Sequence, residues 1–372
     1  MMRAWLVLPI LIFSFCVTFP AAAQDSKPPV KDEIIRIDTQ LVDVPLAVVN
    51  TKGLPVKGLA ATNFLVYEDG KKQEVIDFST TTAPFEVALL LDTSGSARND
   101  LPLIKRAARD FISNLRPGDR VAVIAFNTEG KNNQAYAVSE MLSPLTGDRT
   151  ALASAIDRVR TSNGTPYYDS LLQVADKVFN QRPASEFRGR RALVALTDGV
   201  DSTSAGDFLA AKEDFERIGL ISFFIQVDTR DFFEEALLGD CETATRFSSA
   251  QIRRYYRTIS SKGARIEKAV NFCQLGDFER LAISKRLYEI ADSEMQELAK
   301  TSGGRVFPVG DFSEARNAFK NVADEIGTKY TLGYYSSNEK RDGTYRKIKV
   351  ELKGLPAGTT VRAREGYTAP AN

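Results

Sequence analysis

The chain has 372 residues, 43% hydrophobic and 26% charged, a composition typical of a globular protein with two domains or one large domain with attachments. Its formal net charge is +1, so no general electrostatic attraction to nucleic acid is expected. Histidine is absent, which excludes catalysis by Ser-His-Asp or Cys-His groups and zinc sites with histidine ligands.

The first residues have the pattern of a secretory signal peptide. Arg3 precedes an apolar run over 4–19, and the alanines at 21–23 provide an A-x-A cleavage site. We predict a signal peptide over 1–23 with cleavage after Ala23, which implies a secreted or periplasmic protein. An uncleaved membrane anchor is the alternative, but the run is short for a spanning helix. Residues 24–33 predict a flexible linker, and no later stretch is apolar enough to span a bilayer.

Residues 34–82 are predicted to form a small β module. Apolar residues follow a mostly alternating pattern from Ile35 to Val48, and a second strand-like run covers 64–67. Asp69-Gly70 then predicts a tight hairpin turn, because glycine accepts a positive φ, and the returning strand is expected over 73–78.

The pattern changes at Phe85, where short apolar strands begin to alternate with amphipathic helices. One of these helices is expected to stop at Gly303-Gly304, and the last one covers 312–326. The predicted strands are 85–91, 121–126, 192–196, 220–227 and 305–309. This alternation predicts an α/β, doubly wound, mostly parallel sheet with helices on both faces over 84–327.

A segment of about 229–285 is longer than a doubly wound fold needs and is predicted to be an insertion. It contains Cys241 and Cys273, the two cysteines of the mature chain, and we predict a disulfide between them because an exported protein meets an oxidising compartment. Residues 246–268 are strongly basic. A solvated helical excursion is favoured there over a surface for a polyanion or partner.

Strand-like patterns return over 328–368, with a turn predicted at Asp342-Gly343. We expect these strands to combine with residues 34–82 in one β-sandwich-like module, with the α/β domain inserted between its halves. Two separate small β units are the alternative.

Three predicted loops place oxygen-bearing side chains at the carboxyl edge of the sheet, where ligands bind in doubly wound folds. The first strand leads into Asp92-Thr93-Ser94-Gly95-Ser96, Thr165 precedes a helix, and another strand leads into Thr197-Asp198-Gly199. Such hard oxygen ligands with few charges suit Mg²⁺ or Mn²⁺. With so little negative charge around it, the metal stays electrophilic and accepts a carboxylate from outside.

The order and spacing of these residues resemble the metal-ion-dependent adhesion site of the von Willebrand factor type A domain. The flanking strands, including 330–335 and 362–367, are similar to those of exported bacterial proteins of this group, notably the acidobacterial von Willebrand factor A-related type. The resemblance implies that Ser94, Ser96 and Thr165 contact the metal directly or nearly so. It also implies that Asp92 and Asp198 hold the metal mainly through water.

Each of these residues taken alone is better explained as a helix cap or turn former, and only the whole set argues for a metal site. An aspartic protease or an Asp-x-Asp phosphatase does not fit, because Ser94 stands where glycine or a second carboxylate is needed. No phosphate-binding glycine loop follows the first strand. We therefore expect no enzyme, but an exported adhesion module that binds a carboxylate-bearing protein. A structural scaffold in an exported or envelope assembly, with the metal secondary, is the alternative.

Overall fold

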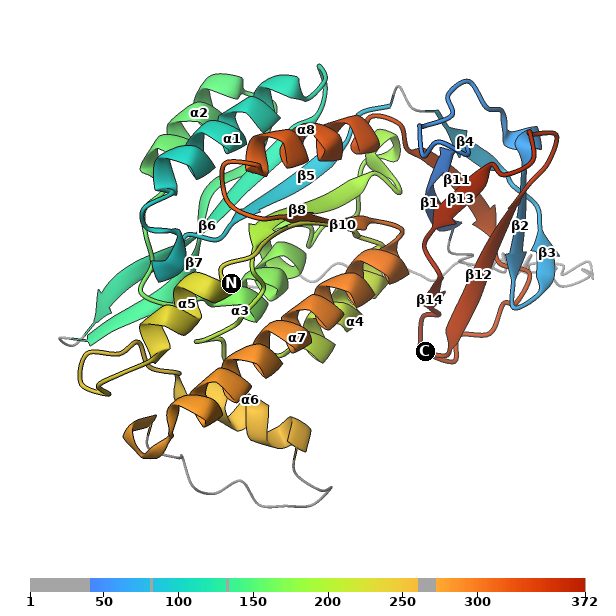
Figure 1. Ribbon diagram of the computed structural model, residues 1–372. Helices are drawn as coiled ribbons and strands as arrows, with labels where there is room; N and C mark the ends of the chain where they lie inside the picture. Colours follow the sequence, from blue (N-terminus) through green and yellow to red (C-terminus); the bar gives the residue numbers. More distant parts are fainter. Residues whose placement is uncertain (1–40, 81–82, 132–133, 260–271, 372) are drawn as a thin grey trace, which may run out of the picture. The chain divides into compact units, whose positions relative to one another are not determined.

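A six-stranded sheet forms the centre of the α/β part of the chain (Figure 1). The computed structural model describes residues 41–80, 83–131, 134–259 and 272–371. The strand order is β10-β9-β8-β5-β6-β7, and only β7 runs antiparallel to its neighbour. The strands are β5 (Glu86–Leu91), β6 (Arg120–Lys131), β7 (Gln134–Thr146), β8 (Arg191–Thr197), β9 (Ile221–Val227) and β10 (Arg305–Val309). Every residue of β5 and β8 is buried, which explains the uninterrupted apolar runs at 87–91 and 192–196.

Helices cover both faces of this sheet, as predicted (Figure 1). One face packs against α1 (Leu101–Asn114), α2 (Arg149–Arg158) and α8 (Ala315–Ile326). The other packs against α3 (Tyr167–Gln173), α4 (Phe208–Ile218), α5 (Arg230–Leu237), α6 (Ser249–Ile259) and α7 (Asp277–Ser302). The doubly wound α/β prediction is therefore confirmed. None of the helices in the described residues combines the length and apolar character needed to cross a membrane.

The predicted helix end at Gly303-Gly304 has a clear physical cause. Gly303 adopts a left-handed conformation with φ of 75°, which a glycine reaches without steric cost. A Cβ atom on Gly304 would lie 1.9 Å from the carbonyl oxygen of Ser222, so only glycine allows this approach to β9. The two glycines thus end α7 and direct the chain into β10.

The strands from the two ends of the chain pair with one another in two four-stranded antiparallel sheets. Their orders are β13-β1-β11-β4 and β14-β12-β2-β3. The strands are β1 (Leu41–Val49), β2 (Phe64–Glu68), β3 (Lys71–Gln73), β4 (Asp77–Ser79), β11 (Tyr330–Tyr335), β12 (Tyr345–Leu352), β13 (Thr360–Ala363) and β14 (Gly366–Thr368). One apolar cluster contains residues from both sheets. The single β-sandwich-like module is therefore confirmed over two separate units.

One strand prediction in this module was wrong. The Asp69-Gly70 turn does join β2 to a returning strand, but that strand ends at Gln73. The chain then crosses to the other sheet, where β4 pairs with β11. Ile76, between the two strands, is 50% exposed, and its amide already donates to the carbonyl oxygen of Gly333 on β11. The predicted strand over 73–78 is thus two short strands in different sheets.

A buried carboxylate joins strands from both ends of the chain inside the sandwich. Glu68 on β2 accepts hydrogen bonds from the hydroxyls of Tyr334 at 2.7 Å and Tyr367 at 2.9 Å. The guanidinium of Arg346 lies 3.4 Å from the same carboxylate, and both charged side chains are at most 3% exposed. The tyrosines and the arginine of the C-terminal segment therefore complete the environment of one N-terminal glutamate.

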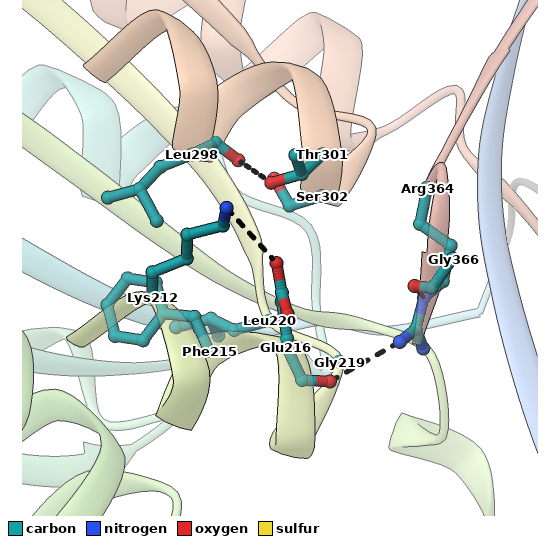
Figure 2. Close-up of a pocket in the computed structure, with 10 residues that line it drawn as sticks. All are labelled: Lys212, Phe215, Glu216, Gly219, Leu220, Leu298, Thr301, Ser302, Arg364 and Gly366. Carbon is teal, nitrogen blue, oxygen red and sulfur yellow. Dashed lines mark hydrogen bonds and ion pairs between the residues drawn. The ribbon is translucent and has the colours of Figure 1, made fainter. Parts of the chain in front are cut away.

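A small pocket lies at the amino ends of the parallel strands, where α4 ends and β9 begins (Figure 2). Arg364, between β13 and β14, points into it and donates hydrogen bonds to the carbonyl oxygens of Glu216 at 3.3 Å and Asp43 at 3.2 Å. Burial lowers the pKa of the Arg364 guanidinium. The pocket contains none of the predicted metal ligands, and its guanidinium is satisfied by backbone oxygens. The bond to Glu216 joins the segment between β13 and β14 to the end of α4.

The predicted insertion contains helices α5 and α6 and the start of α7. A disulfide joins Cys241 and Cys273, whose Cα atoms are 5.2 Å apart. Residues 260–271, which include part of the basic stretch 246–268, lie outside the described residues, as do the predicted signal peptide, the linker and residues 34–40. The described part agrees with a helical excursion, and α6 packs on α7.

We expect the disulfide to stabilise the insertion against unfolding. Closing a loop of 32 residues restricts the unfolded chain, which corresponds to about 3–4 kcal/mol in the chain-entropy model. The variant with both Cys241→Ser and Cys273→Ser should therefore unfold at a lower urea concentration than the wild type. A reducing agent should lower the wild-type midpoint in the same way and leave that of the variant unchanged. Free thiols at both positions in the non-reduced protein, detected by mass spectrometry, would contradict the bond.

Candidate metal centre

The predicted ligands lie at the carboxyl edge of the central sheet, on loops that follow neighbouring strands. β5 stands where the strand order reverses, with β6 on one side and β8 on the other. Ligand sites in open α/β sheets form at such a reversal, because the loops leaving the two neighbouring strands turn to opposite faces. The Asp92 loop follows β5 and the Asp198 loop follows β8. The amide of Asp92 donates to the carbonyl oxygen of Leu196 at 2.9 Å, which keeps the two loops in register.

The Asp92 loop gathers a carboxylate and two hydroxyls. The amide of Ser94 donates to Oδ1 of Asp92 at 3.0 Å, and the hydroxyl of Thr197 donates to Oδ2 at 2.7 Å. The hydroxyl oxygens of Ser94 and Ser96 lie 3.2 Å apart. Asp92 and Ser94 are buried, while Ser96 is half-buried. Both carboxylate oxygens are thus oriented by donors, and the two serine oxygens face each other at the outer side of the loop.

Asp198 is fixed by residues on either side of the site. The amide of Val200 donates to Oδ1 at 2.9 Å, and the hydroxyl of Thr229 donates to Oδ2 at 2.6 Å. The Tyr288 hydroxyl lies 2.9 Å from that of Thr229. Sequence reasoning missed Thr229 and Tyr288. Thr229 follows the predicted strand 220–227 at the same edge of the sheet, and this position was the signal that could have found it.

Thr165 lies on a third loop, which is attached to both of the others. The amide of Ser162 donates to the carbonyl oxygen of Thr93 at 2.7 Å. The amide of Thr165 donates to the hydroxyl of Ser202 at 2.8 Å, and the amide of Ser202 returns a bond to the Thr165 carbonyl at 2.9 Å. The Thr165 side chain is buried. These bonds place the Thr165 loop beside the Asp92 and Asp198 loops, although none of them involves the Thr165 hydroxyl.

The two aspartates are costly to bury without a cation. Burial raises the pKa of Asp92, although hydrogen bonds from Thr197 and Ser94 act in the opposite direction. Burial also raises the pKa of Asp198, and the nearby charge of Asp92 adds to this effect. Among the described residues, no basic side chain is a main influence that would offset the charge of these two carboxylates when they are ionised.

The geometry fits a small divalent cation with oxygen ligands. Mg²⁺ holds ligands at about 2.1 Å in an octahedron, so neighbouring ligand atoms are about 3 Å apart. The separation of 3.2 Å between the Ser94 and Ser96 hydroxyl oxygens is close to that spacing. Among the described residues, no three acidic or cysteine side chains gather into a metal cluster. A cation here therefore needs the hydroxyls as ligands, which is the composition that the sequence predicted.

Helix capping does not account for these side chains. The cap residue before α1 is Asp100, the one before α3 is Pro166, and the one before α4 is Asp207. Ser94 begins a short 3₁₀ turn, but its side chain makes no capping hydrogen bond. Asp92 and Asp198 do accept amides two residues ahead, as turn-forming aspartates commonly do. Turn formation thus explains part of their geometry and leaves the paired serines and Thr165 unexplained.

The fold and these loops define an α/β domain with a group of carboxylate and hydroxyl side chains at its carboxyl edge. The family model described as the von Willebrand factor type A domain matches residues 87–200, a range that contains all five predicted metal ligands. The chain therefore contains a von Willebrand factor type A domain. No curated protein matches the chain.

Several solved structures are similar to the chain. Proximal thread matrix protein 1 from the mussel byssus shares 14% identity over 74% of this chain and 51% of its own, with a TM-score of 0.43. Another structure of that protein, titled as having a zinc-occupied MIDAS motif, shares 13% identity over 65% and 48%, with a TM-score of 0.40. A von Willebrand factor type A protein from Catenulispora acidiphila shares 14% identity over 90% and 75%, with a TM-score of 0.41. The chain spans about half the length of the mussel protein.

Proposed function

We propose that this protein is an exported binding module that captures a carboxylate of a partner protein through Mg²⁺ or Mn²⁺. The observation that carries the proposal is the buried Asp92–Asp198 pair, whose pKa values have no basic side chain of the described residues among their main influences, beside the paired hydroxyls of Ser94 and Ser96. Ser94, Ser96 and Thr165 would contact the cation, and the two aspartates would hold it mainly through water. The bound cation would supply a positive centre that a carboxylate from outside can approach.

Binding is favoured over catalysis by the way the side chains are engaged. Thr197 and Ser94 donate to Asp92, while Thr229 and Val200 donate to Asp198. Each carboxylate oxygen thus accepts a hydrogen bond from the protein, an arrangement that suits the orientation of a cation and its waters. Von Willebrand factor type A domains are usually non-catalytic binding modules. Export rests on residues 1–23 and is tested by sequencing the N-terminus of the mature protein, where we expect Gln24.

The function is tested by capture of a partner from the native envelope with the purified full chain as bait. We expect the partner to be retained in Mg²⁺ or Mn²⁺, released by a chelator, and recovered when the cation is restored. The Ser94→Ala variant should retain nothing under any of these conditions, because it removes one hydroxyl ligand. Retention that is unchanged in chelator would contradict the proposal and favour a scaffold in which the metal is secondary.

A further inference from the structure

The inserted helix α6 is basic on its exposed side. It carries three arginines and no acidic residue. Arg253 and Arg257 are both exposed, and among the described residues neither has an ion pair or a hydrogen bond to its side chain. Residues four apart share one face of a helix, so the two guanidinium groups lie beside each other. Such a pair of unneutralised charges is a surface that attracts an acidic group.

The third arginine attaches α6 to the helix that follows the Thr165 loop. The Arg254 guanidinium carbon lies 4.2 Å from the centre of the Tyr168 ring, in the second residue of α3. The Tyr168 hydroxyl donates to Glu294 of α7 at 2.6 Å. A cation over an aromatic face is attracted by the ring, so this contact helps to hold α6 against the start of α3. Arg254 is therefore a positioning residue, and the two exposed arginines lie within one turn of it.

The Tyr168 contact also connects α6, through the start of α3, to the loops that carry the predicted metal ligands. The neighbouring residue, Tyr167, donates its amide to Asp201 at 3.0 Å, and Asp201 follows Asp198 on the same loop. The positive charge of Arg254 lowers the pKa of Asp201 against the larger effect of burial. A short series of contacts thus links the basic helix to the loop that carries Asp198, through the start of α3.

Through Tyr168 and the start of α3, α6 is linked to the loop that carries Asp198, and its exposed arginines have the same sign of charge as a bound cation. We propose that α6, through Arg253 and Arg257, forms a second contact for the acidic partner, so that the ligand is a protein segment with several carboxylates. One carboxylate would occupy the cation site, and a second would pair with the exposed arginines. This inference rests on the proposed function, because it needs the cation site to bind the same segment.

The test compares two fluorescent peptides with amidated C-termini, an oligoglutamate of about eight residues and a glycine peptide of equal length with a single central glutamate. Binding to the full chain in Mn²⁺ is followed by fluorescence anisotropy. We expect the oligoglutamate to bind the wild type about tenfold more tightly than the single-glutamate peptide at low salt. The Arg253→Glu/Arg257→Glu variant should remove this advantage and leave the affinity for Mn²⁺ unchanged.

A matched control carries the same change in charge elsewhere. Arg106 on α1 and Lys320 on α8 are exposed, and both helices cover the opposite face of the sheet. The Arg106→Glu/Lys320→Glu variant should bind both peptides as the wild type does. Equal affinity of the wild type for the two peptides, no binding of the oligoglutamate, or an equal loss in both variants would overturn the inference.

Chelator separates the two proposals. If the single-glutamate peptide binds equally well with and without Mn²⁺, the cation-dependent function itself fails. If the oligoglutamate binds through the arginines but its binding is unchanged by chelator, the basic helix acts alone and the joint site is wrong. The joint site is supported if the oligoglutamate loses its tenfold higher affinity over the single-glutamate peptide both in chelator and in the Arg253→Glu/Arg257→Glu variant.

Discussion

Saturating Mn²⁺ is expected to raise the free energy of unfolding of the wild-type protein and to leave that of the Asp198→Asn variant unchanged. A ligand that binds only the folded state at 100 times its Kd stabilises that state by about 2.7 kcal/mol. The amide of asparagine has the shape of the carboxylate and keeps a partner for Thr229, but it carries no charge for the cation. Urea unfolding with and without Mn²⁺ measures the difference.

The difference in stability between the wild type and the Asp198→Asn variant should change sign when the cation is removed. Asp92 and Asp198 are both buried, and in the part of the chain that the structure describes no basic side chain is a main influence on their pKa values, so removing one charge relieves desolvation and repulsion. In chelator we therefore expect the Asp198→Asn variant to be at least as stable as the wild type.

Asp201→Asn is the matched control for this reversal, since Asp201 is also buried on the loop but is not a predicted ligand. It should keep the full response to Mn²⁺. A response to Mn²⁺ in Asp198→Asn equal to that of the wild type would remove Asp198 from the site.

The second large effect is expected in the sandwich. Glu68→Ala should lower the free energy of unfolding by about 3–5 kcal/mol, because it leaves the buried charge of Arg346 without its partner. It also removes the acceptor for the hydroxyls of Tyr334 and Tyr367. Urea unfolding monitored by tyrosine fluorescence would follow the loss.

Glu351→Ala provides the comparison, because Glu351 pairs with Lys349 on the exposed surface of β12. Exposed ion pairs contribute little to stability, so no measurable change is expected there. Equal stability of the Glu68 and Glu351 variants would show that the buried network is not a stabilising element.

The strands of the central sheet could be predicted because burial on both faces leaves an uninterrupted apolar sequence, as in β5 and β8. The edge strand β7 was not predicted. Its first three residues are exposed and it contains Pro144, because an edge strand needs neither a continuous apolar face nor every backbone donor. The change of sheet between Gln73 and Asp77 was also missed, since alternation along a strand does not reveal which sheet the strand joins.

The loops that carry the five predicted metal ligands could be located from the sequence because each comes directly after or before a recognisable strand or helix. Parallel strands also bring their carboxyl ends to one edge of the sheet. The contact of Tyr288 with Thr229 could not be predicted in the same way. Thr229 donates to Asp198, but Tyr288 reaches Thr229 from 59 residues further along the chain, so this pairing depends on how the insertion returns to the sheet. Local spacing contains no information on such a distant contact. Whether the five predicted ligands bind a metal stays a prediction.

The pairing of the two chain ends in the sandwich has a consequence for how the protein is made. Glu68 meets Tyr334 across 266 residues, and β1 finds β11 only after the α/β domain has been synthesised. Contacts between such distant residues slow folding, because a long loop must close before they form. The α/β domain can complete its own core in the meantime, while the backbone groups of the N-terminal strands that later pair with the C-terminal strands remain without those partners. The sandwich can therefore form only after the C-terminal strands have been synthesised. A chain interrupted before β11 would leave the N-terminal strands unpaired and exposed, which favours aggregation.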